Sequence, residues 1–322
     1  MSLPVAELHM HIEGSLEPEL IFELAERNSV TLPYRDIDDL RSRYEFTDLQ
    51  SFLDLYFANM QVLRTEQDFA DLARAYFARA AQGGVAHAEI FCNPQAHMAR
   101  GVSLEVVIDG IMDAVSASER EFGLSSGVIA AVLRDRPVRE AVDMLADLLA
   151  MRAPIVGIGL DSAEVGNPPS LFEDVFARAR AEGLHTVAHA GEEGPPEYIW
   201  QALDLLGAER IDHGVRALED PELVRRLVDE QIPLTVCPLS NVRLRVVDTM
   251  AVHPVRRMMT EGLVVTVNSD DPAYFGGYVD DNFTALRDAV DLTDGERDIL
   301  ARNSIRASFA SEARKSELLA AR

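Results

Sequence analysis

Eight short apolar runs recur along the chain, and each ends in polar or charged residues. They are typical of strands because apolar and polar residues alternate in them, or because a continuous apolar stretch is bounded by turn signals. They begin at Ala6 (AELHMHI), Val85 (VAHAEIFCN), Gly127 (GVIAAVLR), Ile155 (IVGIGLDS), His185 (HTVAHAG), Arg210 (RIDHGV), Pro233 (PLTVCPLSN) and Leu263 (LVVTVNSD). Stretches with helical periodicity lie between them, at residues 19–28, 104–122, 138–151, 170–182, 197–206, 221–229 and 254–261.

This alternation predicts the class of fold. Strand–helix–strand units build a parallel sheet, and eight of them predict an α/β fold, the closed (β/α)8 TIM barrel. An open doubly wound sheet is the alternative, but no G-x-G-x-x-G follows the first strand. Residues 29–82 are longer than one crossover needs, so we expect extra helices inserted after the first βα unit. No Pro/Gly/Ser-rich linker divides the chain, and residues 1–322 are expected to form one domain.

Charge and cysteine content narrow the classes of partner. The net charge of −24 repels nucleic acid and anionic membrane surfaces, which leaves a small neutral molecule as the favoured partner. No apolar run approaches the ~20 residues of a membrane-spanning helix, and the N-terminus shows no signal-peptide pattern. Cys92 and Cys237 are too few for a disulfide framework, which favours a reduced, cytoplasmic protein.

The first predicted strand carries two histidines on one face. Apolar residues at 8, 10 and 12 alternate with polar residues at 7, 9, 11 and 13, so His9 and His11 point the same way. Neutral imidazole is the commonest side-chain metal ligand. A pair of hydrogen-bonded core histidines explains this pair alone equally well, so a metal site requires ligands from elsewhere in the chain.

Such residues follow the carboxyl ends of the other predicted strands. Active sites of (β/α)8 enzymes lie at that end of the barrel, and buried imidazoles and carboxylates are costly unless they are paired or bind metal. The polar residues at strand ends are His9 and His11; Asp161, Ser162 and Glu164; His189 and Glu192; Asp212 and His213; Ser240 and Asn241; and Ser269, Asp270 and Asp271. Their convergence from six strands predicts an active site.

Four of these residues are candidate metal ligands. Three imidazoles and one carboxylate suit a zinc ion that keeps an open position for water, and zinc lowers the pKa of that water to roughly 7. Iron(II) and manganese accept the same donors. A structural histidine is the alternative for the third ring. The candidates are His9, His11, His189 and Asp270.

Three further residues have candidate roles in proton transfer and substrate binding. Glu192 follows a strand end in HAGEE, and with a raised pKa it can protonate a substrate nitrogen. Taken alone, it is better explained as a helix N-terminal acid. His213 can orient an attacking hydroxide, or be a satisfied strand histidine. Asp271 is free to bind a ligand if Asp270 binds metal, although Asp before Pro also favours a turn.

Two other catalytic classes are disfavoured. The HAE at residues 87–89 resembles the H-x-E of cytidine-type zinc deaminases, but the required P-C-x-x-C is missing. A serine hydrolase is disfavoured because no G-x-S-x-G is present. We expect His87, His97, His185 and His253 to be structural or exposed.

The motifs HMHIEGS, HAGEE, RIDHGV, CPLSN and NSDDPAYF together resemble the adenosine/adenine deaminase family of metal-dependent amidohydrolase barrels. The resemblance runs from about Ala6 to Ala310. HIEGSLEPEL, DSAEVGNPP and VAHAGEEGPPEYIW look most like the bacterial and fungal adenine deaminase branch. It implies zinc-dependent conversion of adenine to hypoxanthine and ammonia, a reaction of purine salvage.

The same resemblance implies roles for individual residues. One Zn2+ per chain is held by His9, His11, His189 and Asp270. Glu192 donates the proton, His213 assists the hydroxide, and Asp271 binds the purine. Glu13 and Ser162 stand where nucleoside deaminases have an Asp and a Gly toward the sugar, which favours a free base. Cys92 and Asn93 replace the Phe and Asp of the adenine branch. Adenosine and N6-substituted adenines therefore remain alternatives, as does a non-catalytic purine-binding barrel.

Overall fold

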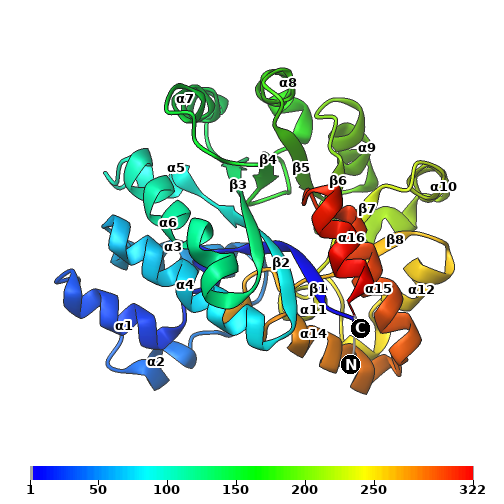
Figure 1. Cartoon of the computed structure of the whole chain (residues 1–322), viewed down its shortest axis with the longest axis horizontal. Coiled ribbons are helices and arrows are strands. Elements are labelled where there is room, and N and C mark those ends of the chain that lie inside the picture. The colour runs from blue at the N-terminus through cyan, green and yellow to red at the C-terminus, as the bar shows by residue number, and fades with distance from the viewer. Residues whose placement is uncertain (1–2, 322) are drawn as a thin grey trace.

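The computed structural model describes residues 3–321, which form an eight-stranded sheet surrounded by helices (Figure 1). Strand neighbours along the chain are also neighbours in the sheet, and every adjacent pair is parallel. The strands are β1 (Val5–His11), β2 (Val85–Cys92), β3 (Ser125–Leu133), β4 (Gly157–Asp161), β5 (His185–Ala190), β6 (Arg210–His213), β7 (Pro233–Val236) and β8 (Val264–Val267). All eight predicted strands are confirmed.

The sheet closes between β1 and the segment that follows β8. His11 N donates to Asp270 O at 2.9 Å, and Asp270 N donates to His9 O at 3.0 Å. One step below, the side-chain oxygen of Asn268 accepts from Leu8 N at 2.9 Å. The barrel is therefore closed at its carboxyl end by the residues that carry the candidate metal ligands, and the predicted (β/α)8 TIM barrel is confirmed.

Helices form the outer layer of the barrel and the predicted insertion after β1. In Figure 1 the inserted helices α2 to α4 lie beside α1. The α-helices are α1 (Pro18–Arg27), α2 (Ile37–Arg41), α3 (Leu49–Asn59), α4 (Glu66–Gln82), α5 (Pro94–Met98), α6 (Leu104–Phe122), α7 (Val138–Ala150), α8 (Glu173–Ala181), α9 (Pro196–Asp204), α10 (Pro221–Asp229), α11 (Pro238–Arg243), α12 (Val255–Thr260), α13 (Pro272–Phe275), α14 (Val279–Val290), α15 (Asp294–Ala307) and α16 (Glu312–Ala320). Of the helices in the described range, none is both long and apolar enough to cross a membrane.

The inserted helix α3 has a well-defined start and a buried apolar face. Asp48 accepts from Ser51 N at 2.8 Å, and Ser51 Oγ accepts from Asp48 N at 3.3 Å, which forms a capping box. Phe52, Leu53 and Tyr56 are buried, at the one-turn spacing expected of a single helix face. This face packs over the mouth of the barrel.

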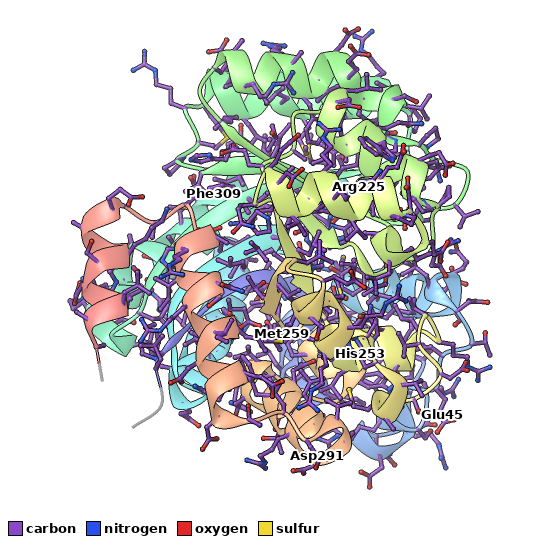
Figure 2. The ribbon with its side chains drawn as sticks, turned by 90° about the vertical axis from the view of Figure 1, so that its right-hand side faces the viewer. Glu45, Arg225, His253, Met259, Asp291 and Phe309 are labelled. Carbon is purple, nitrogen blue, oxygen red and sulfur yellow. The ribbon has the colours of Figure 1, made fainter. Side chains whose placement is uncertain are left out.

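Side chains fill the interior of the barrel. Phe91 of β2 packs with Ile129 and Val187 in a cluster separate from the larger core between sheet and helices. A Cβ at Gly159 of β4 would lie 2.7 Å from the Phe91 ring, so the glycine leaves room for the ring inside the barrel. Phe309, labelled in Figure 2 between α15 and α16, packs against this cluster from the amino end. The cavity with the candidate site residues lies at the carboxyl end of the barrel, above this cluster.

Candidate metal-dependent active site

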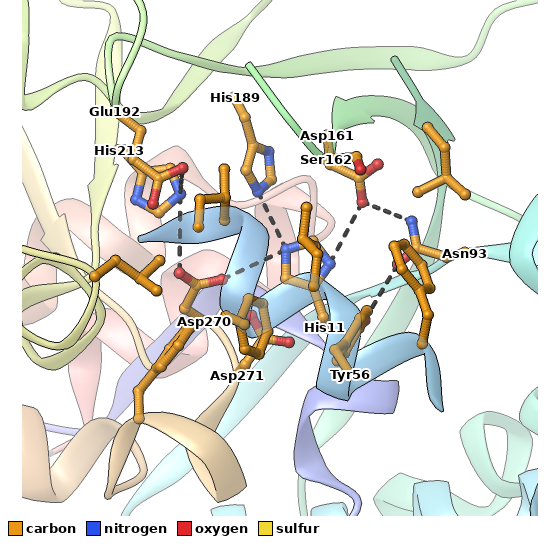
Figure 3. A pocket seen from close by; sticks show the side chains of 17 residues that line it. His11, Tyr56, Asn93, Asp161, Ser162, His189, Glu192, His213, Asp270 and Asp271 are labelled. Atoms are coloured by element: carbon orange, nitrogen blue, oxygen red, sulfur yellow. Dashed lines mark hydrogen bonds and ion pairs between the residues drawn. The ribbon is translucent and has the colours of Figure 1, made fainter. Parts of the chain in front are cut away.

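Three histidines and one aspartate meet at the carboxyl end of the barrel, and Figure 3 shows three of them, His11, His189 and Asp270. His9 and His11 lie on β1, His189 lies on β5, and Asp270 follows β8. One ligand atom of each lies within 4.8 Å of the others. His11 Nε2 is 3.1 Å from His189 Nε2, while Asp270 Oδ1 is 3.4 Å from His9 Nε2 and 3.5 Å from His11 Nε2. The four residues predicted to bind metal are thus brought together.

The arrangement of nitrogen atoms fits a bound cation. His9 Nδ1 lies 3.1 Å from the carbonyl oxygen of Thr235, which favours a proton on Nδ1 and a lone pair on Nε2. His9 Nε2 is buried and has no hydrogen-bond partner among residues 3–321. Imidazole lone pairs that converge on one point, beside a carboxylate, need a cation between them. Three nitrogens and one oxygen match the donors that zinc prefers.

A carboxylate and a hydroxyl support two of these rings from behind. Asp212 Oδ2 lies 3.3 Å from His189 Nδ1, and Asp212 Oδ1 accepts the Thr235 hydroxyl at 2.7 Å. The same hydroxyl oxygen is 3.1 Å from His9 Nδ1. Partners of this kind fix the ring orientation and tautomer of metal-binding histidines. The sequence analysis placed Asp212 at a strand end without assigning it this role.

A second series of polar side chains reaches the third ring, that of His11. Asp161 Oδ2 lies 3.5 Å from His11 Nδ1 and accepts from the Asn93 amide at 2.6 Å. Tyr56 OH donates to Asn93 Oδ1 at 3.2 Å, and this bond connects α3 to the series of polar side chains (Figure 3). Asn93 lines the cavity and Cys92 does not, so one of the two positions at which this sequence is expected to depart from the adenine branch lies within the site.

The backbone around the site is held in an unusual conformation. Ser162, His213 and Asp270 adopt left-handed φ values of 73°, 63° and 65°, which are rare for residues other than glycine. Such strain persists where the surrounding structure imposes it, and it concentrates at functional sites. Below the metal ligands, the Phe91 ring stacks on His11 with centroids 5.0 Å apart. The site therefore rests on a rigid apolar base.

Glu192 and His213 face each other beside the candidate metal site. His213 Nε2 lies 3.5 Å from Glu192 Oε2 and 3.8 Å from Asp270 Oδ2. Burial, reinforced by the Asp270 carboxylate, raises the pKa of Glu192 well above its ordinary value. This shift favours the protonated form of the carboxyl group. His213 and Cys237 also lie near His9 and Asp270 in an overlapping group that could hold an ion.

Asp271 lines the cavity next to Asp270. Its Oδ1 is buried and has no partner in the described part of the chain. Burial, followed by the charge of Asp270, raises its pKa well above the ordinary value. A Cβ at Gly14 would lie 2.0 Å from Asp271 Oδ1, so only glycine allows this placement.

Glu13 and Ser162 occupy different positions around the cavity. Ser162 lines it, and its buried hydroxyl has no partner within residues 3–321. Glu13 is fully buried but does not line the cavity. Its Oε1 accepts from Asn93 N at 3.0 Å and from His97 Nε2 at 2.9 Å, while its Oε2 is unpartnered in the described structure. His97 is structural, as expected.

The apolar wall of the cavity was not found from the sequence. About 410 Å³ of empty space, part of it open to solvent, lies between the polar residues and this wall. The wall consists of Leu49, Phe52, Leu53, Tyr56 and Phe57 of α3, together with Leu133, Leu244 and Phe275. A site with one apolar wall and a few convergent polar groups is typical of small-molecule binding. The periodicity of α3 was the available signal, but it does not distinguish a cavity wall from ordinary core.

The chain belongs to the adenosine deaminase family, whose model matches residues 4–321. This agrees with the resemblance inferred from the five motifs. A solved adenine deaminase from Arthrobacter aurescens is 63% identical, superposes with a TM-score of 0.98, and is covered over 97% of its length by 99% of this chain.

Two curated relatives and a second solved structure also match the chain over most of its length. Adenine deaminase of Streptomyces coelicolor is 59% identical over 312 residues, which is 97% of this chain and 92% of that protein. Adenine deaminase of Ectopseudomonas mendocina is 55% identical over 309 residues, 96% of this chain and 98% of that protein. A cog1816 amidohydrolase from Burkhoderia ambifaria with bound Zn is 28% identical, with a TM-score of 0.91 over 99% of this chain and 89% of that one.

Proposed function

We propose that the protein is a hydrolytic adenine deaminase that converts adenine and water into hypoxanthine and ammonia. High identity to adenine deaminases over nearly the whole chain supports the reaction. The observation that carries the proposal is the convergence of three imidazole nitrogens and Asp270 Oδ1 beside a carboxyl group with a raised pKa. The proposed ligands of a single zinc ion are His9, His11, His189 and Asp270.

The residues around the metal site divide the chemistry among them. Zinc, when bound, supplies an activated water for attack on C6 of the purine. His213 Nε2 faces the space between Glu192 and Asp270, where it orients that water by hydrogen bonding. A new C6–O bond forms and the bond from C6 to the exocyclic nitrogen breaks. Of the two protons of the attacking water, one completes the departing ammonia and the other replaces the proton that Glu192 gives to N1.

Glu192 acts as the general acid. Its raised pKa favours the protonated form of the carboxyl group, and transfer of this proton to ring N1 makes C6 more electrophilic. Asp271, whose pKa is raised by the same kind of burial, presents a carboxyl group suited to donate to N7. These two contacts orient the ring with C6 toward the metal site.

The far edge of the purine has two proposed contacts. Ser162 supplies a buried, unpartnered hydroxyl, in the part of the chain described, that faces N3. Glu13 lies behind the residues that line the cavity, and its unpartnered Oε2, among the residues described, is the proposed acceptor for N9–H, which requires the base to reach past that lining. A nucleoside lacks that hydrogen and needs room for a sugar, so both features favour adenine over adenosine.

Kinetics with three substrates test the assignment. Adenine, adenosine and N6-methyladenine are assayed side by side with enzyme of measured metal content. We expect about one zinc per chain, following the single-zinc catalytic pattern, and the highest kcat/KM with adenine. A higher kcat/KM with adenosine or N6-methyladenine would replace the substrate assignment. A metal-free protein with full activity would contradict the mechanism.

A further inference from the structure

Glu164 makes an unusual set of hydrogen bonds to the loop that carries Glu192. Its Oε1 accepts from Gly191 N at 2.7 Å, and its Oε2 accepts from Glu192 N at 3.1 Å, Glu193 N at 2.9 Å and Gly194 N at 2.7 Å. Four consecutive backbone donors thus converge on one carboxylate. Glu164 is 1% exposed, follows β4, and does not line the cavity.

These bonds are needed because the loop lies between secondary structure elements. β5 ends at Ala190 and α9 begins at Pro196, so the intervening N–H groups lack helix or sheet partners. Buried backbone donors without partners are costly, and bonds to an ionised carboxylate are stronger than neutral ones. Glu164 therefore binds the N–H groups of the loop, while Arg216 binds two of its carbonyl oxygens, Glu193 O through the guanidinium and Gly191 O through the backbone N–H.

Both ends of the loop require glycine, Gly191 for its backbone conformation and Gly194 for its contact with Glu164. Gly191 has a φ of +70°. A Cβ at Gly194 would lie 2.5 Å from Glu164 Oε1, so a side chain there would expel the carboxylate. The sequence G-E-E-G after β5 is thus matched to an acid that comes from β4.

The Glu192 side chain has little else to hold it. Its Oε1 is buried without a hydrogen-bond partner in the described residues, and its Oε2 has only the 3.5 Å contact to His213. The position of its carboxyl group is therefore set mainly by its backbone. That backbone is held by Glu164, and the Arg134 guanidinium donates to His189 O at 2.7 Å just before the loop.

We propose that Glu164 is a positioning residue that aligns the Glu192 carboxyl group with the substrate by clamping residues 191–194. The proposal rests on the proposed deaminase function, in which Glu192 transfers the proton. It predicts that Glu164 affects turnover only through Glu192, without contact to substrate or metal.

The test is a double-mutant cycle between Glu164→Gln and Glu192→Gln. Glutamine has nearly the same volume, but its NH2 group would face N–H donors, so the loop loses part of its clamp. We expect Glu164→Gln to lower kcat by about 10- to 100-fold, as misplacement of a catalytic group by about 1 Å does. KM and metal content should change little. In the Glu192→Gln background, Glu164→Gln should change kcat by less than about threefold, because residues that act as a unit are not additive.

Controls separate this role from a general structural one. Glu197→Gln makes the same chemical change at an exposed position of α9 and should leave kcat unchanged. If Glu164→Gln does not fold, Glu164→Asp retains the charge but is too short to reach all four donors, and it should show the same non-additivity. The proposal would be overturned if the two substitutions lowered kcat by the product of their separate effects. It would also be overturned if Glu164→Gln alone left kcat unchanged or lost metal in parallel with activity. Failure of the wild type to convert adenine would instead contradict the proposed function, and the cycle would then be run on whichever aminopurine is converted.

Discussion

Asp212 Oδ2 lies 3.3 Å from His189 Nδ1, on the side of the ring away from the cavity. Through the Thr235 hydroxyl, the same carboxylate also reaches the ring of His9. We expect Asp212→Asn to weaken metal binding by about 10- to 100-fold, because the change removes the group that orients and polarises two ligands. Competition with a chromophoric chelator measures this directly. Asp229→Asn, exposed on α10, is the matched control, and equal affinity in the two variants would exclude the role.

Replacement of the proposed general acid has a different signature. Glu192→Gln retains the shape of the side chain but has no acidic proton, and positioned proton transfer contributes ~10²–10⁴-fold to rate. We therefore expect kcat to fall by about that factor while metal content stays normal, because Glu192 is not one of the four proposed ligands. Steady-state kinetics and elemental analysis of the same preparation test both parts. Near wild-type turnover would show that another group supplies the proton.

Gly14 controls the position of Asp271. An added methyl group at Gly14 would lie 2.0 Å from Asp271 Oδ1 and 2.6 Å from its Cα, so the neighbouring backbone has to move. We expect Gly14→Ala to raise KM and lower kcat/KM for the purine by at least about tenfold, since displacement of a binding group by an ångström is costly. Gly295→Ala, where nothing lies within 4 Å of the added carbon, should be silent.

The sequence predicted which side chains would converge where an imidazole or a carboxylate stands at the end of a strand. His9, His11, His189 and Asp270 were recognisable because buried imidazoles and carboxylates at the ends of parallel strands must converge in a barrel. Periodicity also gave the strands, because their apolar runs are short and bounded by turn signals. The observed ends of the helices differ from the predicted ends by a few residues. The helix predicted at 170–182 is α8 (Glu173–Ala181), because residues 169–172 form a separate 3-10 turn.

Other parts of the site depend on contacts that no local pattern specifies. Asp212 and Glu164 stand at strand ends like the metal ligands, and only their distances show that they act on other residues. Phe91 reads as an ordinary apolar strand residue, although its ring lies under three histidines. The apolar face of α3 is typical of any amphipathic helix, and its place over the cavity follows from the tertiary fold.

A buried ion pair at the amino end of the barrel makes stability depend on acid pH. Burial by itself raises the pKa of Glu89, but Arg210 and His87 outweigh it and lower this pKa from 4.5 to about 2. A carboxyl group with a lowered folded-state pKa stabilises the protein above pH 4.5, and this contribution is lost as the pH falls toward 2. The free energy of unfolding should therefore fall steeply in this window.

Glu89→Gln isolates this contribution. At neutral pH the variant should be less stable by about 3–5 kcal/mol, because the buried Arg210 charge loses its partner. The difference from the wild type should narrow between pH 4.5 and 2, where Glu89 itself takes up a proton. Urea unfolding followed by circular dichroism gives both quantities, with the exposed Glu119→Gln as the control. A difference that stays constant over this range would contradict the assigned pKa shift.

The preference for a free base is tested at Glu13. Arg100 donates to His97 Nδ1, so His97 Nε2 carries the proton that is donated to Glu13 Oε1 at 2.9 Å. This leaves Oε2, which has no partner within residues 3–321, as the proposed acceptor for N9–H of adenine. In Glu13→Gln, the amide oxygen can take the place of Oε1 and retain the bonds from His97 and from Asn93 N. The NH2 group then replaces the free oxygen and turns an acceptor into a donor.

Glu13→Gln should therefore lower kcat/KM for adenine much more than for adenosine, which has no N9–H to lose. A site that hydrogen-bonds a substrate N–H rejects an analogue without it by as much as ~10⁴–10⁵. We therefore expect kcat/KM for adenine to fall by at least about 10²-fold in Glu13→Gln. Glu13→Ala should also narrow the gap between the two substrates, but with a loss of stability, because it leaves His97 and Asn93 N without their shared acceptor. Thermal unfolding separates the two effects. Equal losses for both substrates in Glu13→Gln would show that Glu13 supports the fold of the site without contact to N9.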